Sequence, residues 1–444
     1  MDICSTYSVK IKDYNNIFKE SIYLYRKSVD FFIDVCLKEW DSIEPVANKK
    51  DASVNVLEKL TIPTGKRPNV KYNFNKKFYK MPSYLRRAAI KEAVGQVSSY
   101  KSNLKKWKSQ DIKTRGKEPS RPKAGFCYPC LYRGNMFNFL DTYKAEIKVF
   151  RNNTWDWLEV DLKKSDIDYI KRRYNSKNMK VPKLQKRGKQ WFLDFPFKET
   201  VDLNKTDISN QTIVAVDLGI NSAATLTVMT SDGTILDRCF LKLSKEYDSL
   251  NHSVNRIKKA QQNRNYKTPR LWAKVKGLTH DISVKTTNFI IDKATLYNAD
   301  TIVFEHLDVK KKKSHNQKIH LWKCQDVQKM VTHKAHKLSI RISHICARNT
   351  SKLAFDGSGF VVRGSEAGFK SYSICRFQNG KVYNCDLSAA YNIGARYFIR
   401  EILKSLPEKV RLVIEAKVPQ CTKRSTCTFS TLISLNAELK MLAS

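Results

Sequence analysis

The chain has 444 residues, with 82 Lys and Arg against 42 Asp and Glu, so its formal net charge is +40. This length suits about three domains, and the charge excess predicts a polyanionic partner. The first twenty residues lack an apolar signal segment, and no run approaches the roughly 18 apolar residues of a membrane span, so we expect a cytosolic protein. Its 11 cysteines, an odd number without a secretory signal, predict reduced thiols and argue against a disulfide framework.

The N-terminal part predicts a short strand at 8–12 followed by two helices. Apolar residues spaced by four and three mark a helix over 18–36, and a second helix over 82–108 ends in a basic cluster. This cluster consists of Lys105, Lys106 and Lys108. The polar stretch 109–123 contains two prolines and indicates an exposed linker.

A small β-rich domain is predicted next. The runs 145–150, 155–162 and 190–197 alternate aromatic and β-branched residues between polar turns. Between them, Lys171, Arg172 and Arg173 precede Tyr174, a mixture of cations and aromatics that favours nucleic-acid contact.

The third region has the clearest pattern. Antiparallel strands are predicted at 212–217, 223–228 and 235–241, then a long helical section, a fourth strand at 301–305, a helix at about 322–347 and, after a loop-rich insert, a final helix from Asp386. This order is typical of an RNase H-like domain that carries an insertion. The predicted fold class is therefore α/β and multidomain.

Three carboxylates fall at the ends of these elements. Asp217 ends the first strand, Glu305 ends the fourth, and Asp386 begins the last helix. Each has an ordinary explanation, as a turn former, a strand-end charge or a helix N-cap. Their co-occurrence in a strongly basic chain instead favours a site where they hold two magnesium ions for phosphodiester hydrolysis.

The strings around these residues carry a resemblance to a known family. Residues 216–221 (VDLGIN), 304–307 (FEHL) and 386–393 (DLSAAYNI) resemble the three active-site motifs of TnpB proteins and of the related type V CRISPR effectors. The similarity extends over about 212–400 and, more faintly, over the N-terminal half. It implies a prokaryotic, nucleoid-associated RNA-guided DNA endonuclease of a transposable element, with Asp217, Glu305 and Asp386 as catalytic magnesium ligands.

The resemblance also implies a domain plan, in which a β-barrel-like wedge domain, interrupted by a helical recognition module, precedes a RuvC-like nuclease domain. The expected bounds are 1–14 and 124–205 for the wedge, 15–123 for the recognition module with its linker, 206–345 and 383–403 for the nuclease, 346–382 for a degenerate zinc-ribbon-like insert and 404–444 for a C-terminal tail. The tail has no predicted function.

The implied partners are a guide RNA, which pairs with one strand of target DNA, and the DNA itself, on which the protein reads a short flanking motif. Lysines would contact phosphates along a basic channel. The run Lys310, Lys311, Lys312 and Lys313 resembles a lid segment near the scissile strand, although a solvated helix start explains it almost as well.

The cysteine pattern departs from the family. Many relatives carry two Cys-x-x-Cys pairs between the second and third motifs, but here Cys375 alone remains, with Gln378 at the position of its mate. Cys346, Cys385 and His344 lack ribbon spacing, so we expect a zinc-free insert that contacts nucleic acid. The isolated pair Cys127 and Cys130 is assigned no metal.

Three alternatives from other classes stay open. A nuclease-inactive RNA-guided repressor would not need three carboxylates. A transposase usually has the order Asp, Asp, Glu with its glutamate on a helix, whereas here the glutamate lies between two aspartates. A plain RNA-binding protein would not cleave DNA in the presence of a divalent metal.

Overall fold

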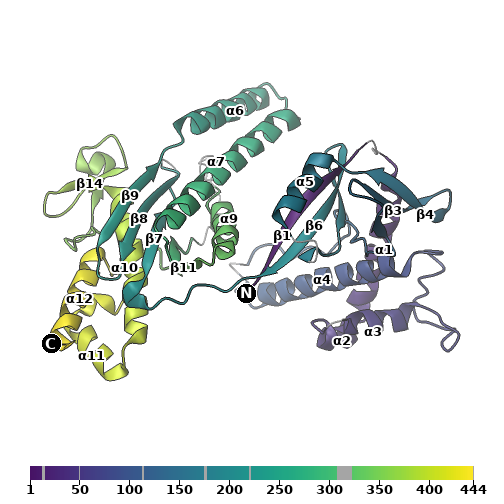
Figure 1. Cartoon of the computed structure of the whole chain (residues 1–444), viewed down its shortest axis with the longest axis horizontal. Helices are drawn as coiled ribbons and strands as arrows, with labels where there is room; N and C mark the ends of the chain where they lie inside the picture. Colours follow the sequence, from purple (N-terminus) through teal and green to yellow (C-terminus); the bar gives the residue numbers. More distant parts are fainter. Residues whose placement is uncertain are drawn as a thin grey trace. The chain divides into compact units, whose positions relative to one another are not determined.

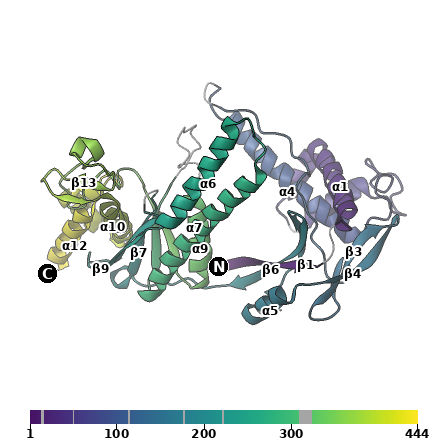
Figure 2. The ribbon, with the colours of Figure 1, turned by 90° about the horizontal axis from the view of Figure 1, so that it is seen from above.

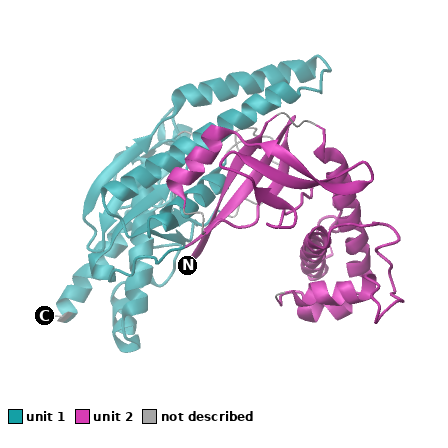
Figure 3. Ribbon diagram, turned by 45° about the vertical axis from the view of Figure 1, so that its right-hand side comes forward, with its two compact units in different colours: residues 1, 200–444 teal, residues 2–199 magenta. Residues whose placement is uncertain are grey.

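The computed structural model describes residues 1–12, 16–49, 51–112, 115–174, 178–219, 222–307 and 323–443. The chain forms two compact units, shown in Figure 3. The N-terminal unit is Asp2–Glu199, and the C-terminal unit is Thr200–Ser444 together with Met1. Over the described residues, the helices are too short or too polar to cross a membrane. The finer domain bounds expected from the sequence remain predictions.

In the N-terminal unit, two long helices pack against each other. They are α1 (Phe18–Lys38) and α4 (Ser83–Lys108), which closely match the predicted helices. Their apolar faces share one core, in which Phe32 and Phe74 stack with ring centroids 5.0 Å apart. The shorter elements α2 (Trp40–Ile43), η1 (Glu44–Val46) and α3 (Ala52–Thr61) lie between them in the chain.

The same unit contains two three-stranded sheets. One has the order β1 (Asp2–Ile11), β6 (Gln190–Thr200), β5 (Lys183–Arg187), and the other the order β2 (Phe137–Phe139), β3 (Lys144–Arg151), β4 (Thr154–Asp161). Helix α5 (Lys164–Arg173) follows β4. The β-rich character is confirmed, although the first strand begins earlier than predicted and α5 was not foreseen. The barrel-like arrangement remains a prediction.

The C-terminal unit is built on a five-stranded sheet with the order β11-β10-β7-β8-β9. Its strands are β7 (Thr212–Asp217), β8 (Ala224–Thr230), β9 (Ile235–Leu241), β10 (Thr301–Glu305) and β11 (Arg341–Ile345). The first three are antiparallel, as predicted. Strand β10 runs parallel to β7, with Phe304 opposite Val216, and β11 runs parallel to β10.

Helices cover both faces of this sheet (Figure 1). Because alternate residues of a strand point to opposite faces, Val214 and Val216 share a core with α7 (Pro269–Leu296) and α9 (Cys324–Lys337). Ile213 and Ala215 instead share a core with α10 (Cys385–Ser405) and α12 (Phe429–Ala443). The apolar run of β7 is therefore explained by burial on both sides. Helix α6 (Ser244–Gln262) packs along α7, as Figure 2 shows.

Two predictions for this unit were wrong. The helix expected at 322–347 ends at Lys337, and β11 follows it. The left-handed Ser339, with φ of 62°, ends the helix, and Ile340 and Ile342 then follow the period of a strand. The helix that contains Asp386 is also not the final one.

The predicted tail is folded. It forms α11 (Glu408–Lys417), η5 (Pro419–Cys421) and α12, whose buried side chains belong to the core beneath α10. The insert before α10 forms a small sheet of β12 (Val362–Arg363), β13 (Ile374–Arg376) and β14 (Val382–Asn384). The 3-10 turn η4 (Gly364–Ala367) lies between β12 and β13 in the chain.

Candidate functional site

Asp217 and Glu305 lie at the ends of neighbouring strands. Since Val216 is paired with Phe304 in the parallel β7–β10 register, the next residue on each strand is one of these carboxylates. The chain turns tightly after β7, where a Cβ at Gly219 would lie 2.8 Å from the carbonyl oxygen of Ser222. Both carboxylates are partly exposed, so solvent and ligands can reach them.

Asp386 comes to the same place from α10. This helix packs closely on β7 and β8 at Gly394. A Cβ at this position would overlap Met229 and lie 3.2 Å from the Cβ of Ala215, so glycine permits the close approach. The N-cap of α10 is Asn384, whose side chain accepts a hydrogen bond of 2.9 Å from Leu387 N. Asp386 is therefore not required as the helix cap, which removes its ordinary explanation.

The three carboxylates interact electrostatically. Burial raises the pKa of Asp217 well above its usual range, and the negative charges of Glu305 and Asp386 raise it further. Burial also raises the pKa of Glu305 and of Asp386. Such repulsion between like charges destabilises the ionised site and is relieved by a bound cation or by protons.

Two neighbouring groups offset part of this charge. The hydroxyl of Thr350 donates a hydrogen bond to Glu305 Oε1, which counters the rise in its pKa. Arg363, on β12, lowers the pKa of Asp217 and Asp386 by its positive charge, although burial outweighs it in both. Arg363 Nη2 is buried and has no hydrogen-bond partner among the residues that the structure describes.

Near Glu305, the buried side chain of Arg396 connects the loop after β11 with the loop before α12. It donates to the carbonyl oxygens of Cys346 and Arg348 at 2.7 and 2.8 Å, and to those of Cys427 and Ser425 at 3.0 and 3.2 Å. The first pair lies in the loop after β11 that also holds Thr350. Arg396 therefore fixes the loop whose hydroxyl contacts Glu305, and its charge also lowers the pKa of Glu305.

Replacing Asp217 by Asn should raise the melting temperature of the metal-free protein by a few degrees at pH 8. Because the folded pKa of Asp217 is raised, its contribution to stability is fully present below its unfolded pKa of about 4 and is lost as pH rises through the folded value. The advantage of Asn should therefore shrink as pH falls toward about 4, which thermal melts across a pH series will measure.

Asp237 is the matched control of opposite sign. Its carboxylate accepts hydrogen bonds of 2.9 Å from both Cys239 Sγ and Lys293 Nζ, which lower its pKa. Asp237→Asn should lower the melting temperature at neutral pH, and this loss should disappear in acid. Equal changes in melting temperature for the two variants would contradict the inference that the ionised Asp217 is destabilised by burial and by its neighbours' charges.

The chemistry of the donor set fits magnesium. Magnesium prefers oxygen ligands and retains several waters, so a few carboxylates from separate elements suffice. Over the described ranges, however, no three Asp, Glu, His or Cys side chains lie close enough together to bind a metal ion by themselves. The carboxylates therefore supply charge and oxygen donors, while waters and a phosphate would complete the coordination.

Cys375 of the insert and Cys385 at the start of α10 are buried. Cys375 and Cys385 lie in one small apolar cluster with Phe377, and the Cys375 thiol donates to the Tyr383 carbonyl oxygen at 3.5 Å. Cys127 is likewise buried and contacts Gln96 and Glu92. These contacts give the thiols structural roles, and the absence of zinc stays a prediction.

The predicted basic contacts lie on helix ends. Lys105, Lys106 and Lys108 are exposed in the last turn of α4, and Lys171, Arg172 and Arg173 are exposed in the last turn of α5. Arg173 lies over the ring of Tyr169 at 4.8 Å. Lys310, Lys311, Lys312 and Lys313 lie outside the described residues. Thr350, Arg363 and Arg396 were not predicted, because their neighbours in space are far away in sequence.

The matches between this chain and solved structures have low sequence identity and low TM-scores. The Cas12f1–sgRNA–target DNA complex is 14% identical, covers 88% of this chain and 98% of its own, and gives a TM-score of 0.34. CasPhi-2 (Cas12j) bound to crRNA and phosphorothioate-DNA is 12% identical, with coverage of 87% and 90% and a TM-score of 0.43. The assignment of this chain to a family therefore rests on similarity of sequence to its relatives.

Two proteins of Aquifex aeolicus (strain VF5) are such relatives. TnpB-like protein aq_aa05 is 26% identical over 242 residues, which are 49% of this chain and 77% of that protein, and this confirms the resemblance drawn from the three motifs. The uncharacterized protein aq_aa04 is 37% identical over 119 residues, which are 24% of this chain and 67% of that protein. The model of the Aq_aa04 family matches residues 5–151. The chain belongs to the Aq_aa04 family.

Proposed function

We propose that this protein is an RNA-guided DNA endonuclease of a transposable element, and that its C-terminal unit is a RuvC-like nuclease domain. The observation that carries the proposal is the placement of Asp217, Glu305 and Asp386 at two adjacent strand ends and one helix start, where Asp217 is repelled by the other two. A net charge of +40 supplies the affinity for nucleic acid.

The three carboxylates would hold magnesium, which when bound supplies Lewis-acid stabilisation of the attacking and leaving oxygens. Thr350 keeps the carboxylate of Glu305 in one orientation through its hydrogen bond. Arg363 adds a positive charge beside Asp217 and Asp386, so it can attract a phosphate to the site. Arg396 holds the loop that carries Thr350.

RNA guidance is inferred from the similarity to a TnpB-like protein and from the charge distribution. Base pairing between guide and target would select the sequence, while exposed cations would bind the phosphates of both strands without regard to sequence. The lysines and arginines at the ends of α4 and α5 suit this role, because they are exposed.

A nuclease-inactive repressor fits these observations less well. The repulsion at Asp217 reduces stability, and a protein that only binds nucleic acid gains nothing from it. A transposase also fits less well, since Glu305 ends a strand and is not on a helix.

Changing the guide should redirect cleavage. Purified protein would be loaded with either of two unrelated guides and given plasmids that match one or the other, each with the same flanking sequence. We expect cleavage of the matched plasmid alone, in the presence of magnesium. Cleavage that ignores the guide, or that proceeds equally well without RNA, would exclude RNA guidance and leave a general metal-dependent nuclease.

A further inference from the structure

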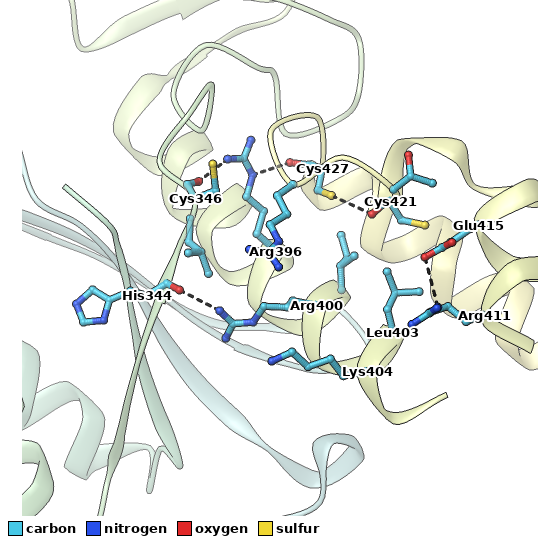
Figure 4. Close-up of a pocket in the computed structure, with 14 residues that line it drawn as sticks. His344, Cys346, Arg396, Arg400, Leu403, Lys404, Arg411, Glu415, Cys421 and Cys427 are labelled. Atoms are coloured by element: carbon cyan, nitrogen blue, oxygen red, sulfur yellow. Dashed lines mark hydrogen bonds and ion pairs between the residues drawn. The ribbon is translucent and has the colours of Figure 1, made fainter. Parts of the chain in front are cut away.

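A cavity of about 230 Å³ lies in the C-terminal unit, away from the three carboxylates. As Figure 4 shows, its walls come from the end of β11, one side of α10, helix α11 and the loop after η5. The site residues Asp217, Glu305 and Asp386 do not line it.

The charge of this cavity is unbalanced. Among the described residues that line it are five cationic side chains and one carboxylate, namely Arg396, Arg400, Lys404, Arg411, Arg424 and Glu415. The three cations of α10 recur at steps of four, so they project from one side of the helix. Such a concentration of like charge in a concave site attracts an anion.

Part of this positive wall is rigid. Arg400 donates to the carbonyl oxygen of His344 at 2.9 Å and to Ser343 Oγ at 2.6 Å, while Arg396 is held by its four carbonyl acceptors. Figure 4 shows the hydrogen bond from Arg400 to the carbonyl oxygen of His344, a residue of β11. These two residues are held in place, although the charge of Arg400 is partly offset by its ion pair with Glu401 at 2.7 Å.

Other donors remain available. Nε of Arg411 is buried and has no hydrogen-bond partner among the described residues. It lies 3.8 Å from Glu415 Oε1, which is a loose ion pair, and an acceptor is therefore missing at this atom. Arg424 is exposed beside the opening, and Lys404 has an exposed side chain that pairs with Glu401 at 3.1 Å.

We infer that this cavity binds a phosphate group, with Arg411 as the principal contact and Arg424 and Lys404 as further cationic contacts. Guanidinium groups bind phosphate through paired hydrogen bonds, and the surrounding charges favour a dianion. The phosphate could belong to a nucleic-acid backbone or to a free nucleotide. Binding here requires neither magnesium nor the carboxylates, so the inference stands apart from the proposed nuclease activity.

Helix α11 provides matched variants for a test. Arg411→Gln removes the unpaired donor, whereas Lys409→Gln removes one charge from an exposed position on the same helix outside the cavity. Glu415→Gln removes the one lining carboxylate, and Glu408→Gln is its exposed counterpart. Titration calorimetry of the full chain with inorganic phosphate, without magnesium, gives the affinity of each.

We expect Arg411→Gln to bind phosphate about tenfold more weakly, or about 1.4 kcal/mol, because a charged hydrogen-bond donor is lost. Glu415→Gln should bind more tightly, and the two control variants should change by less than about twofold, as single exposed charges do. Equal losses in Arg411→Gln and Lys409→Gln, or weaker binding by Glu415→Gln, would overturn the inference.

Two further probes distinguish the sources of the phosphate. If the natural ligand is a free nucleotide, adenosine monophosphate should bind more tightly than phosphate and depend on Arg411. If it is a polynucleotide backbone, a short single-stranded oligonucleotide should lose more affinity in Arg411→Gln than in Lys409→Gln. A null result with every probe would reject the cavity as a phosphate site, and it would leave the nuclease proposal untouched because no cleavage is measured.

Discussion

Asp217→Ala, Glu305→Ala and Asp386→Ala should each reduce guide-directed DNA cleavage by at least about 10³-fold, while guide and target still bind. Metal ions at such sites stabilise the transition state by several kcal/mol, and about 1.4 kcal/mol corresponds to a factor of ten in rate. Carboxyl groups do not attract phosphate, so their loss should leave the contacts with the guide and target backbones in place. Single-turnover cleavage and filter binding measure the two effects separately.

Asp248→Ala is the control, because Asp248 is an exposed carboxylate on α6 in the same unit. It should cleave at the wild-type rate. Full cleavage by any one of the three site variants would remove that residue from the site. Loss of cleavage together with loss of RNA binding would point instead to a folding defect.

The second large effect is expected for Arg396→Met, which should destabilise the C-terminal unit by about 3–5 kcal/mol. The arginine is 4% exposed and donates to four carbonyl oxygens, which methionine would leave without their donor. For a unit of this size the melting temperature should fall by roughly 10 °C.

Differential scanning calorimetry measures this change, with Arg256→Gln as a control at an exposed position of α6. Arg396→Lys should give an intermediate loss, since an ammonium group lacks the fork that reaches two loops at once. A melting temperature within one or two degrees of the wild type would show that Arg396 is dispensable for the two loops.

The sequence predicted the parts of the fold that depend on local pattern. The three antiparallel strands and the strand that ends at Glu305 were recognised because their apolar runs are short and bounded by turns. The short strand β11 was predicted as helix, because only three residues, one of them the left-handed Ser339, separate it from the preceding helix. A period of two is hard to detect over so few residues.

The site itself could be predicted only in part. The carboxylates carry their own signal, since each ends or begins a recognisable element. Thr350 and Arg363 carry none, because their importance comes from contacts with residues far away in sequence. Arg396 follows the third motif directly, yet its role depends on carbonyl oxygens about 30 and 50 residues away, at Cys427 and Cys346.

The connections of Arg396 also bear on how the protein is made. Chains fold as they leave the ribosome, from the N-terminus onward. Ser425 and Cys427, which accept hydrogen bonds from Arg396, are synthesised after all three carboxylates. Until this late segment has emerged, Arg396 lacks two of its four acceptors, so a growing chain that already contains the three carboxylates would hold the loop that supports Glu305 less firmly.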